Sequence, residues 1–286
     1  MTRLYAEVIG DPIAQSKSPA IHNFWLQRLG LEADYRACHV VSSGLNDYFA
    51  QRKADPLWRG CNVTMPHKQA VIPHLDALDS LAGRIVAVNT IRRDADGLLI
   101  GCNTDANGFL EPLRPLLKER HLFRMARVLG TGGAARAIVA ALAGEGVVIV
   151  LAGRDPAKAR ALLDELDPGG EHHTTDLAHF SEETHFPFDD RQGCFDLVVN
   201  ASPLGMAGQP PLAFDLSHAP PGSIFYDIVT HPLQTPLLQA ARQGGFRTLD
   251  GLNMLIGQAA EAFEHFFGCP PPREPGDRDL RALLTG

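Results

Sequence analysis

Long apolar segments and runs of positive charge are both missing from this sequence of 286 residues. No apolar run approaches the roughly 20 residues that cross a bilayer, and polar residues interrupt the N-terminal segment early, so neither a membrane span nor a signal peptide is predicted. The 26 Lys and Arg are outnumbered by 33 Asp and Glu, which gives a formal net charge of -7. No nucleic acid or membrane partner is therefore expected, although a local basic site could bind a small anion.

Cysteine is sparse and shows no pairing pattern. The five cysteines are scattered and no C-x-x-C motif occurs, and the twelve histidines have no H-E-x-x-H or similar spacing. These absences argue against a disulfide framework and against a metal site, and they favour a cytoplasmic protein. His172 and His173 stand together in a polar stretch, where we expect a solvated loop.

The composition that remains is that of an ordinary globular protein, with 45% hydrophobic residues, and the length favours two domains. Ser18 before Pro19 looks like the N-cap of a helix with proline in its first turn. Asp96-Gly97 between two apolar runs predicts a β-hairpin. The β-prone segments before this hairpin are 4–10, 34–41 and 60–63. Together they predict an α/β domain with a mixed sheet.

The pattern changes after about residue 120. Residues 124–155 read as a strand, a glycine turn, an Ala-rich helix and a second strand, which is one βαβ unit. Two further buried strands, a helix with a glycine stop and a long helix at 252–268 follow. The last segment is Pro-rich, although its "LRALL" stretch could form a short helix.

The glycine turn has the sequence GTGGAARA and lies between a strand and a helix. Small residues let a backbone approach a pyrophosphate, and a helix N-terminus offers unpaired N–H groups. This context predicts a dinucleotide site, with a tight turn that binds nothing as the alternative. The candidate residues are Gly130, Thr131, Gly132, Gly133, Ala134 and Ala135.

The next strand ends at Arg154 and Asp155, where a dinucleotide fold meets the adenosine ribose. Asp155 can bind the ribose hydroxyls of NAD, whereas Arg154 can accommodate the 2′-phosphate of NADP. Asp155 also fits a helix N-cap, because Pro156 would then occupy the first helical position. Both interpretations of Asp155 stay open at this point.

Three polar residues follow or adjoin strand ends in the first part of the chain: Lys68, Asn89 and Asp105. Lys68 closes the motif NVTMPHK, and the residues after it, Gln69–Ile72, look like the start of a helix. If the strands are parallel, all three side chains can converge at one crevice. Lys68 and Asp105 would then form an acid/base pair, whereas the alternative is a set of ordinary polar loops and helix caps.

Two further candidates are less specific. Ser16 and Ser18 in the motif SKSP could bind a carboxylate with their hydroxyls, although an N-cap alone would explain Ser18. Gln258 is polar within an apolar helix, so it is either exposed or makes one directed hydrogen bond.

Taken together, the motifs resemble those of the shikimate dehydrogenase family. VIGDPIAQSKSPAIHN, NVTMPHK, AVNTI, NTDANGF, LGTGGAARA, NASPLGM and LDGLNMLIGQAAEAFEHFFG occur here in the family's order, from about residue 5 to residue 268. The resemblance implies two α/β domains that face each other across a cleft. A substrate-binding domain would comprise residues 1–105 and 252–286, and a Rossmann-type NAD(P)-binding domain would comprise residues 106–251.

The resemblance also implies an activity and a role for each candidate residue. The family reduces 3-dehydroshikimate to shikimate with NADPH in aromatic biosynthesis, as a soluble enzyme that we expect to be a monomer or a homodimer. Lys68 and Asp105 would be the catalytic pair. The implied substrate contacts are Ser16, Ser18, Thr64, Asn89 and Gln258. Beyond the glycine turn and Arg154 with Asp155, the implied cofactor contacts are Asn200, Ser202, Gly205, Asp227 and Met254.

Three residues depart from the family pattern. Asp155 replaces the usual Thr after Arg154, Thr230 replaces a usual Tyr, and Val86 replaces a usual Gly before AVNT. We expect NADP as the cofactor, because Asp155 fits the N-cap better than the ribose. The alternatives are an NAD-dependent quinate or shikimate dehydrogenase with a catabolic role, and a non-catalytic protein that binds NAD(P) or a ring acid. Retention of both Lys68 and Asp105 argues against the non-catalytic alternative.

Overall fold

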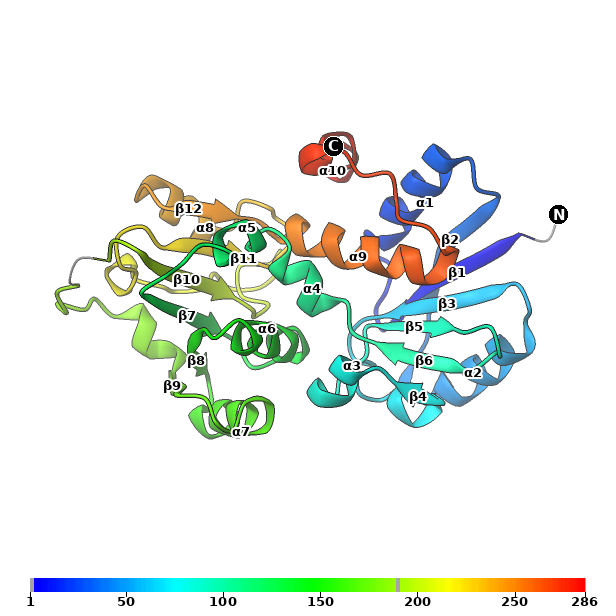
Figure 1. Ribbon diagram of the computed structural model, residues 1–286, viewed down its shortest axis with the longest axis horizontal. Coiled ribbons are helices and arrows are strands. Elements are labelled where there is room, and N and C mark those ends of the chain that lie inside the picture. Colours follow the sequence, from blue (N-terminus) through cyan, green and yellow to red (C-terminus); the bar gives the residue numbers. More distant parts are fainter. Residues whose placement is uncertain (1–2, 189–190, 286) are drawn as a thin grey trace. The chain divides into compact units, whose positions relative to one another are not determined.

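The computed structural model describes residues 3–188 and 191–285. The chain divides into two units, which Figure 1 shows with their labelled elements. The first unit holds Met1–Thr104 and Ile256–Gly286, and the second holds Asp105–Leu255. The sequence predicts the junctions between the units after residues 105 and 251, and in the structure they fall after residues 104 and 255. The chain therefore leaves the first unit once and later returns to it.

The first unit is built on a mixed sheet of six strands in the described residues. β1 pairs in parallel with β2 and β3, whereas β5 pairs antiparallel with β3 and with β6, so the predicted mixed sheet and hairpin are confirmed. In spatial order β2-β1-β3-β5-β6-β4, the strands are Ala33–His39, Leu4–Gly10, Trp58–Val63, Thr90–Arg93, Leu99–Cys102 and Ala77–Leu78.

The helices of the first unit include α9, which begins in the second unit. They are α1 (Ser18–Leu29), α2 (Leu45–Ala54), α3 (Ser80–Ile85), α9 (Gly251–Phe267) and α10 (Arg278–Thr285). Gly60 on β3 permits the close approach of α9, because a Cβ there would lie 2.2 Å from the Ile91 carbonyl oxygen and 2.8 Å from the Phe266 ring. Glycine is therefore required at this position both by space and by its φ of +148°.

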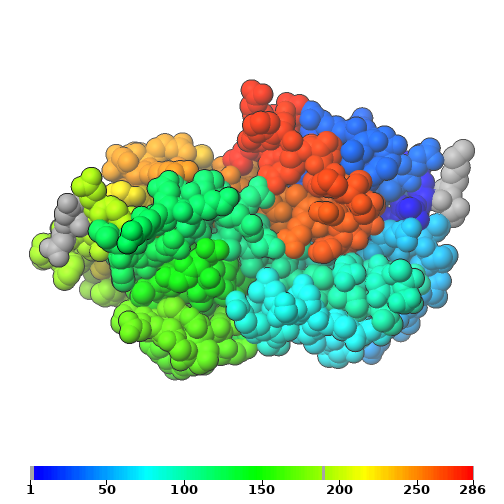
Figure 2. Space-filling model, in the orientation of Figure 1, coloured from blue at the N-terminus to red at the C-terminus, as the bar shows by residue number. Residues whose placement is uncertain are grey.

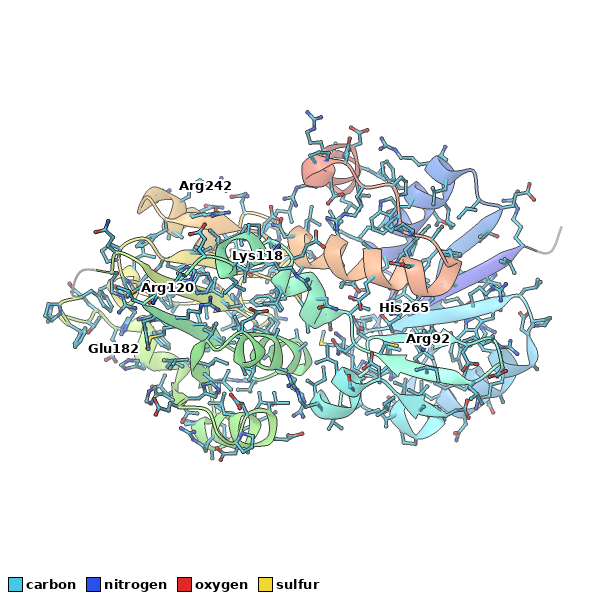
Figure 3. The ribbon with its side chains drawn as sticks, in the orientation of Figure 1. Arg92, Lys118, Arg120, Glu182, Arg242 and His265 are labelled. Atoms are coloured by element: carbon cyan, nitrogen blue, oxygen red, sulfur yellow. The ribbon has the colours of Figure 1, made fainter. Side chains whose placement is uncertain are left out.

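Two polar side chains interact electrostatically where α9 covers the sheet. His265 on α9 and Arg92 on β5 are both partly buried, and both are labelled in Figure 3. Burial lowers the pKa of His265, and the positive charge of Arg92 lowers it further. This contact belongs to the packing of α9 and lies outside the candidate residues.

The second unit has a parallel sheet of six strands in the described residues, in the order β12-β11-β10-β7-β8-β9. Its strands are β7 (Phe123–Leu129), β8 (Val148–Gly153), β9 (His173–Asp176), β10 (Cys194–Asn200), β11 (Ile224–Asp227) and β12 (Arg247–Leu249). Its helices are α4 (Asp105–Leu110), α5 (Arg114–Leu117), α6 (Gly133–Gly144), α7 (Pro156–Leu166) and α8 (Pro236–Gln243). The strand order reverses between β7 and β10, so the predicted Rossmann-type fold is confirmed.

Three local predictions were wrong. Ser18 is not the N-cap of α1, because that position belongs to Lys17, which makes no side-chain cap. Gln69–Ile72 forms turns that lead into a short 3₁₀ helix, Ile72–His74. His172 is buried rather than solvated, since its Nδ1 accepts a hydrogen bond from the Ile149 N–H and its Nε2 lies 3.0 Å from Asp167. His173 begins β9.

Among residues 3–188 and 191–285, no helix combines the length and the apolar character that crossing a membrane requires. The same residues contain no cluster of three or more His, Cys, Asp or Glu side chains arranged to hold a metal ion.

Candidate active site

The segment Thr64–Lys68 follows β3 and lies over the ends of neighbouring strands. The Thr64 N–H donates to the Ile9 carbonyl at 3.0 Å, and the Lys68 carbonyl accepts from the Val88 N–H at 2.8 Å. The segment is thereby fixed between the end of β1 and the residues that precede β5. Lys68 is half-buried there.

Asn89 comes close to this segment from the start of its strand, and its carbonyl accepts from the Val63 N–H at 2.7 Å. Convergence was predicted on the condition that the strands are parallel, but β5 runs antiparallel to β3, so Asn89 precedes its strand instead of following it. Thr90 pairs with Asn62 at the end of β3 and with Cys102 at the end of β6. One strand start and two strand ends therefore meet at the same edge of the sheet.

A buried amide and hydroxyl network surrounds Asn89. Its Oδ1 accepts from the Thr104 N–H at 2.8 Å, and its Nδ2 donates to the Thr104 hydroxyl at 3.0 Å. The Gln258 Oε1 lies 3.5 Å from the Asn89 Nδ2 and 3.4 Å from the Thr104 Oγ1. Gln258 is therefore buried and hydrogen-bonded, which decides between its two interpretations. The network fixes the chain at Thr104, directly before Asp105 at the start of α4.

The serine loop, residues 16–18, is held by a hydrogen bond between its own residues. The Ser16 hydroxyl accepts from the Ser18 N–H at 3.3 Å, a bond within the loop that does not make Ser16 the N-cap of α1. Ser18 is buried, and its hydroxyl lies against Tyr35. The Tyr35 hydroxyl donates to the Asn62 Oδ1 at 2.6 Å, and burial raises the pKa of Tyr35. Sequence reasoning missed Tyr35, because nothing in its local pattern separates it from other strand residues. It gave no role to Asn62, although Asn62 opens the motif NVTMPHK.

The glycine turn of the second unit has the room that a pyrophosphate needs. Gly130 has a φ of +123°, and a Cβ on it would lie 2.8 Å from the Ala201 carbonyl oxygen. Gly132 is the N-cap of α6 and provides no side-chain cap, and a Cβ there would have no neighbour within 4 Å. The first turn of α6 thus presents backbone N–H groups without a capping side chain, which is the arrangement that binds phosphate groups.

The conflict between Arg154 and Asp155 is resolved by the capping geometry. The Asp155 carboxylate accepts from the N–H groups of Ala157 at 3.0 Å and Lys158 at 3.2 Å, with Pro156 in the first turn of α7. The N-cap interpretation of Asp155 is therefore confirmed. Arg154 is exposed beside it.

Asn200 and Asp227 form a fully buried pair behind the loops that follow β10 and β11. The Asn200 Nδ2 donates to Asp227 at 3.0 Å, and its Oδ1 accepts from the Ser202 hydroxyl at 2.7 Å. Asp227 also accepts from the Val229 N–H and from the Thr235 hydroxyl. Burial raises the pKa of the Asp227 carboxyl, and these donors oppose that rise. The pair thus ties the two loops together through their side chains.

Two other candidates lie in the same unit. Gly205 has a φ of +86°, which favours glycine, and its N–H donates to the Pro210 carbonyl at 2.7 Å. Met254 is buried in the first turn of α9.

The fold defines a class of two-unit α/β proteins in which a Rossmann-type unit accompanies a mixed-sheet unit. Two family models match the chain: the shikimate dehydrogenase substrate binding domain over residues 8–91, and the shikimate 5′-dehydrogenase C-terminal domain over residues 251–276. A shikimate dehydrogenase (NADP(+)) of Sphingopyxis alaskensis is 53% identical over 98% of this chain and 97% of its own length. The chain belongs to the shikimate dehydrogenase family.

Solved structures agree with this assignment. The shikimate 5-dehydrogenase of Thermus thermophilus, in complex with NADP(H) and shikimate, has a TM-score of 0.78 and 33% identity over 98% of this chain and 99% of that one. A quinate dehydrogenase of Corynebacterium glutamicum in complex with NAD has a TM-score of 0.81 and 31% identity over 99% and 98% of the two chains.

Proposed function

We propose that this protein is an NADP-dependent shikimate dehydrogenase, which interconverts 3-dehydroshikimate and shikimate. The observation that carries the proposal is the 53% identity to a shikimate dehydrogenase (NADP(+)) along almost the whole of both chains. The candidate residues of the first unit support it, because Thr64, Lys68, Asn89 and Gln258 come from one edge of one sheet and the helix that packs on it.

Lys68 and Asp105 are proposed as the proton-transfer pair. Reduction of a ring ketone needs a hydride on carbon and a proton on oxygen, and bound NADPH supplies the hydride. Lys68 supplies the proton or polarises the carbonyl oxygen, and Asp105 orients the ammonium group. The network around Asn89 supports this assignment, because it fixes the backbone on both sides of the pair: Val88, which binds the Lys68 carbonyl, and Thr104, which precedes Asp105.

The remaining candidates are proposed to bind and orient. Ser16 and Ser18 would hold the substrate carboxylate, whereas Thr64, Asn89 and Gln258 would bind the ring hydroxyls. Gly130–Ala135 would receive the pyrophosphate at the N-terminus of α6. Asn200 and Asp227 are bonded to each other and buried, so their proposed part is to shape the loops that carry Ser202 and Gly205 beside the cofactor. Met254 would lie along the nicotinamide.

The cofactor assignment rests on the Arg154 region. Arg154 is exposed and always charged, so its planar fork can pair with a 2′-phosphate. Asp155 does not oppose this contact strongly, since its carboxylate is engaged in capping α7. The quinate dehydrogenase neighbour with NAD keeps one alternative open, a quinate or shikimate dehydrogenase that uses NAD.

A panel of two ring acids and two cofactors tests the proposal. We expect the purified protein to oxidise shikimate with NADP at a higher kcat/KM than quinate with NADP, or than either acid with NAD. Higher kcat/KM for quinate with NAD would establish the alternative. Absence of turnover with all four pairs, while NADP still binds, would identify a non-catalytic protein.

A further inference from the structure

The motif NVTMPHK contains a residue that the proposed function does not use, His67. Its side chain is completely buried in the first unit, although Lys68 beside it is half-buried. The His67 Nε2 lies 2.6 Å from the carbonyl oxygen of Val40, the residue after β2. Because a carbonyl only accepts, the Nε2 must carry the proton. The Nδ1 has no hydrogen-bond partner among the described residues, so the bond to Val40 is the one that fixes the ring.

The acceptor of this bond is itself well anchored. Val40 is buried, and its N–H donates to the Gly10 carbonyl at the end of β1. The bond therefore ties the turn that carries Lys68 to the ends of β1 and β2, which form the parallel part of the sheet.

Backbone bonds hold the other points of the turn. The Met65 carbonyl accepts from the Asp11 N–H at 3.1 Å, and the Lys68 carbonyl accepts from the Val88 N–H at 2.8 Å. Within the turn, the His67 N–H donates to the Thr64 carbonyl at 3.0 Å. The bond from His67 to Val40 differs from these in one respect: it depends on the identity of a side chain, so a substitution can remove it alone.

We infer that His67 is a positioning residue for Lys68, which sets the placement of the Lys68 backbone through its bond to Val40; this inference rests on the proposed proton-transfer role of Lys68. Without the donor, the buried Val40 carbonyl loses its partner and the turn can shift to find another. A displacement of about 1 Å at a reacting group can lower a rate by about 10²-fold. The glycine turn that is proposed to bind the cofactor belongs to the second unit, so NADP binding does not depend on this bond.

Two substitutions isolate the bond. His67→Gln keeps an N–H donor at about the reach of Nε2, whereas His67→Asn has a shorter amide that cannot reach the same acceptor. With shikimate and NADP, we expect kcat of the Asn variant to fall about 10- to 100-fold and that of the Gln variant to fall much less. The dissociation constant for NADP is expected to stay at the wild-type value in both.

His218 provides a matched control. It is buried in the second unit, and its Nε2 lies 2.8 Å from the Glu182 carbonyl oxygen, so the same type of bond occurs away from the candidate residues. His218→Asn should lower the melting temperature by a similar amount to His67→Asn and leave kcat unchanged. Equal kcat in wild type, His67→Asn and His67→Gln would show that the bond is only structural and would overturn the inference. An inactive wild-type protein would instead reject the proposed function, so the two failures are distinguishable.

Discussion

At the scale of single residues, His22 in the first unit has a strongly lowered pKa. It stacks on Tyr35 with ring centroids 3.9 Å apart and lies in an aromatic cluster with Trp25, Phe263 and Phe266. Neither ring nitrogen has a hydrogen-bond partner among the described residues. Complete burial lowers the pKa of His22 to about 3, from an ordinary value of 6.5. The folded protein therefore keeps this ring neutral where the unfolded chain protonates it.

This difference predicts acid sensitivity. Below pH 6.5 the unfolded chain binds a proton at His22 that the folded protein binds only near pH 3, so stability falls as the pH drops through this window. At pH 5 the loss should be about 2 kcal/mol. In urea unfolding, the free energy of unfolding of His22→Phe should fall correspondingly less between pH 7 and pH 5. The control His185→Asn, at an exposed position, should show the same fall as the wild type. An identical loss in wild type and His22→Phe would assign the acid sensitivity to other groups.

Lys68 has a direct test. Lys68→Met removes the ammonium group and keeps an unbranched apolar chain, so it should lower kcat for shikimate oxidation by about 10² to 10⁴-fold with a smaller change in KM. Asp105→Asn should impair turnover through the loss of the carboxylate that is proposed to orient Lys68. Steady-state kinetics of both variants provide the measurement, and near-normal kcat in Lys68→Met would remove Lys68 from the mechanism.

Arg154 and Asp155 can be separated in the same way. Arg154→Ala should weaken NADPH binding by about 10- to 100-fold, because a charge-assisted contact contributes about 1.5–3 kcal/mol, and it should change NADH binding little. Asp155→Asn keeps a good N-cap and removes the charge, so it should raise the preference for NADP only slightly. Fluorescence titration of both cofactors gives the four dissociation constants. Equal weakening of NADPH and NADH in Arg154→Ala would place Arg154 away from the 2′-phosphate.

For single residues, the sequence predicted the role of a side chain correctly where a rule of local backbone geometry determines that role. Asp155 before Pro156 is an N-cap by backbone geometry alone, and the structure has it so. Ser18 before Pro19 suggested the same rule, but the helix begins one residue earlier and the Ser16 hydroxyl meets the Ser18 N–H. The roles of Tyr35 and Asn62 depend on strand pairing far along the chain, and no local rule contains that information.

At the scale of elements, α10 is hydrogen-bonded to the serine loop through Lys17. The Lys17 Nζ donates to the Leu284 carbonyl at 2.8 Å near the C-terminal end of α10, where the helix dipole favours a cation. Arg28 at the other end of α1 pairs with Asp279 of α10. In the space-filling view of Figure 2, α10 in red lies against α1 in blue. Lys17 stands between Ser16 and Ser18, so α10 anchors the loop that is proposed to hold the substrate carboxylate.

Lys17→Met should therefore raise KM for shikimate about 3- to 10-fold, as expected for a loss of roughly 1 kcal/mol in loop order, and leave kcat and NADP binding nearly unchanged. Arg28→Met breaks the other tie to α10 at a distance from the loop and should raise KM less. If the two variants have the same KM as wild type, α10 contributes to the fold alone.

Elements were predicted best where hydrophobic pattern and turn chemistry agree, as in the βαβ unit and the Asp96-Gly97 hairpin. The helix expected after Lys68 failed for an identifiable reason. Pro73 has no N–H to donate to the Gln69 carbonyl, so an α-helix that starts at Gln69 cannot propagate, and a 3₁₀ turn forms at Ile72–His74 instead. The antiparallel direction of β5 relative to β3 could not be read from the sequence, because the pairing of these two strands follows from the tertiary path.

At the scale of the whole molecule, the order in which parts of the chain become available differs between the two units. The second unit is one continuous stretch, Asp105–Leu255, whereas the first needs the part of α9 that begins at Ile256 to fill its core. Phe263 is completely buried there, and Phe266 lies against Gly60. A ribosome makes the strands of the first unit before the helix that covers them. The apolar face of the first unit therefore stays exposed until α9 has been synthesised. The second unit is synthesised later but is complete before then, so it can fold first.

A fragment of residues 105–255 should accordingly unfold cooperatively by itself, whereas a fragment of residues 1–104 should remain without a cooperative transition until a 256–286 peptide is added. Circular dichroism with urea titration of each fragment gives the comparison, and a cooperative 1–104 fragment would contradict it. Before α9 is synthesised, this chain therefore depends most on chaperones that cover exposed apolar surface in the cell.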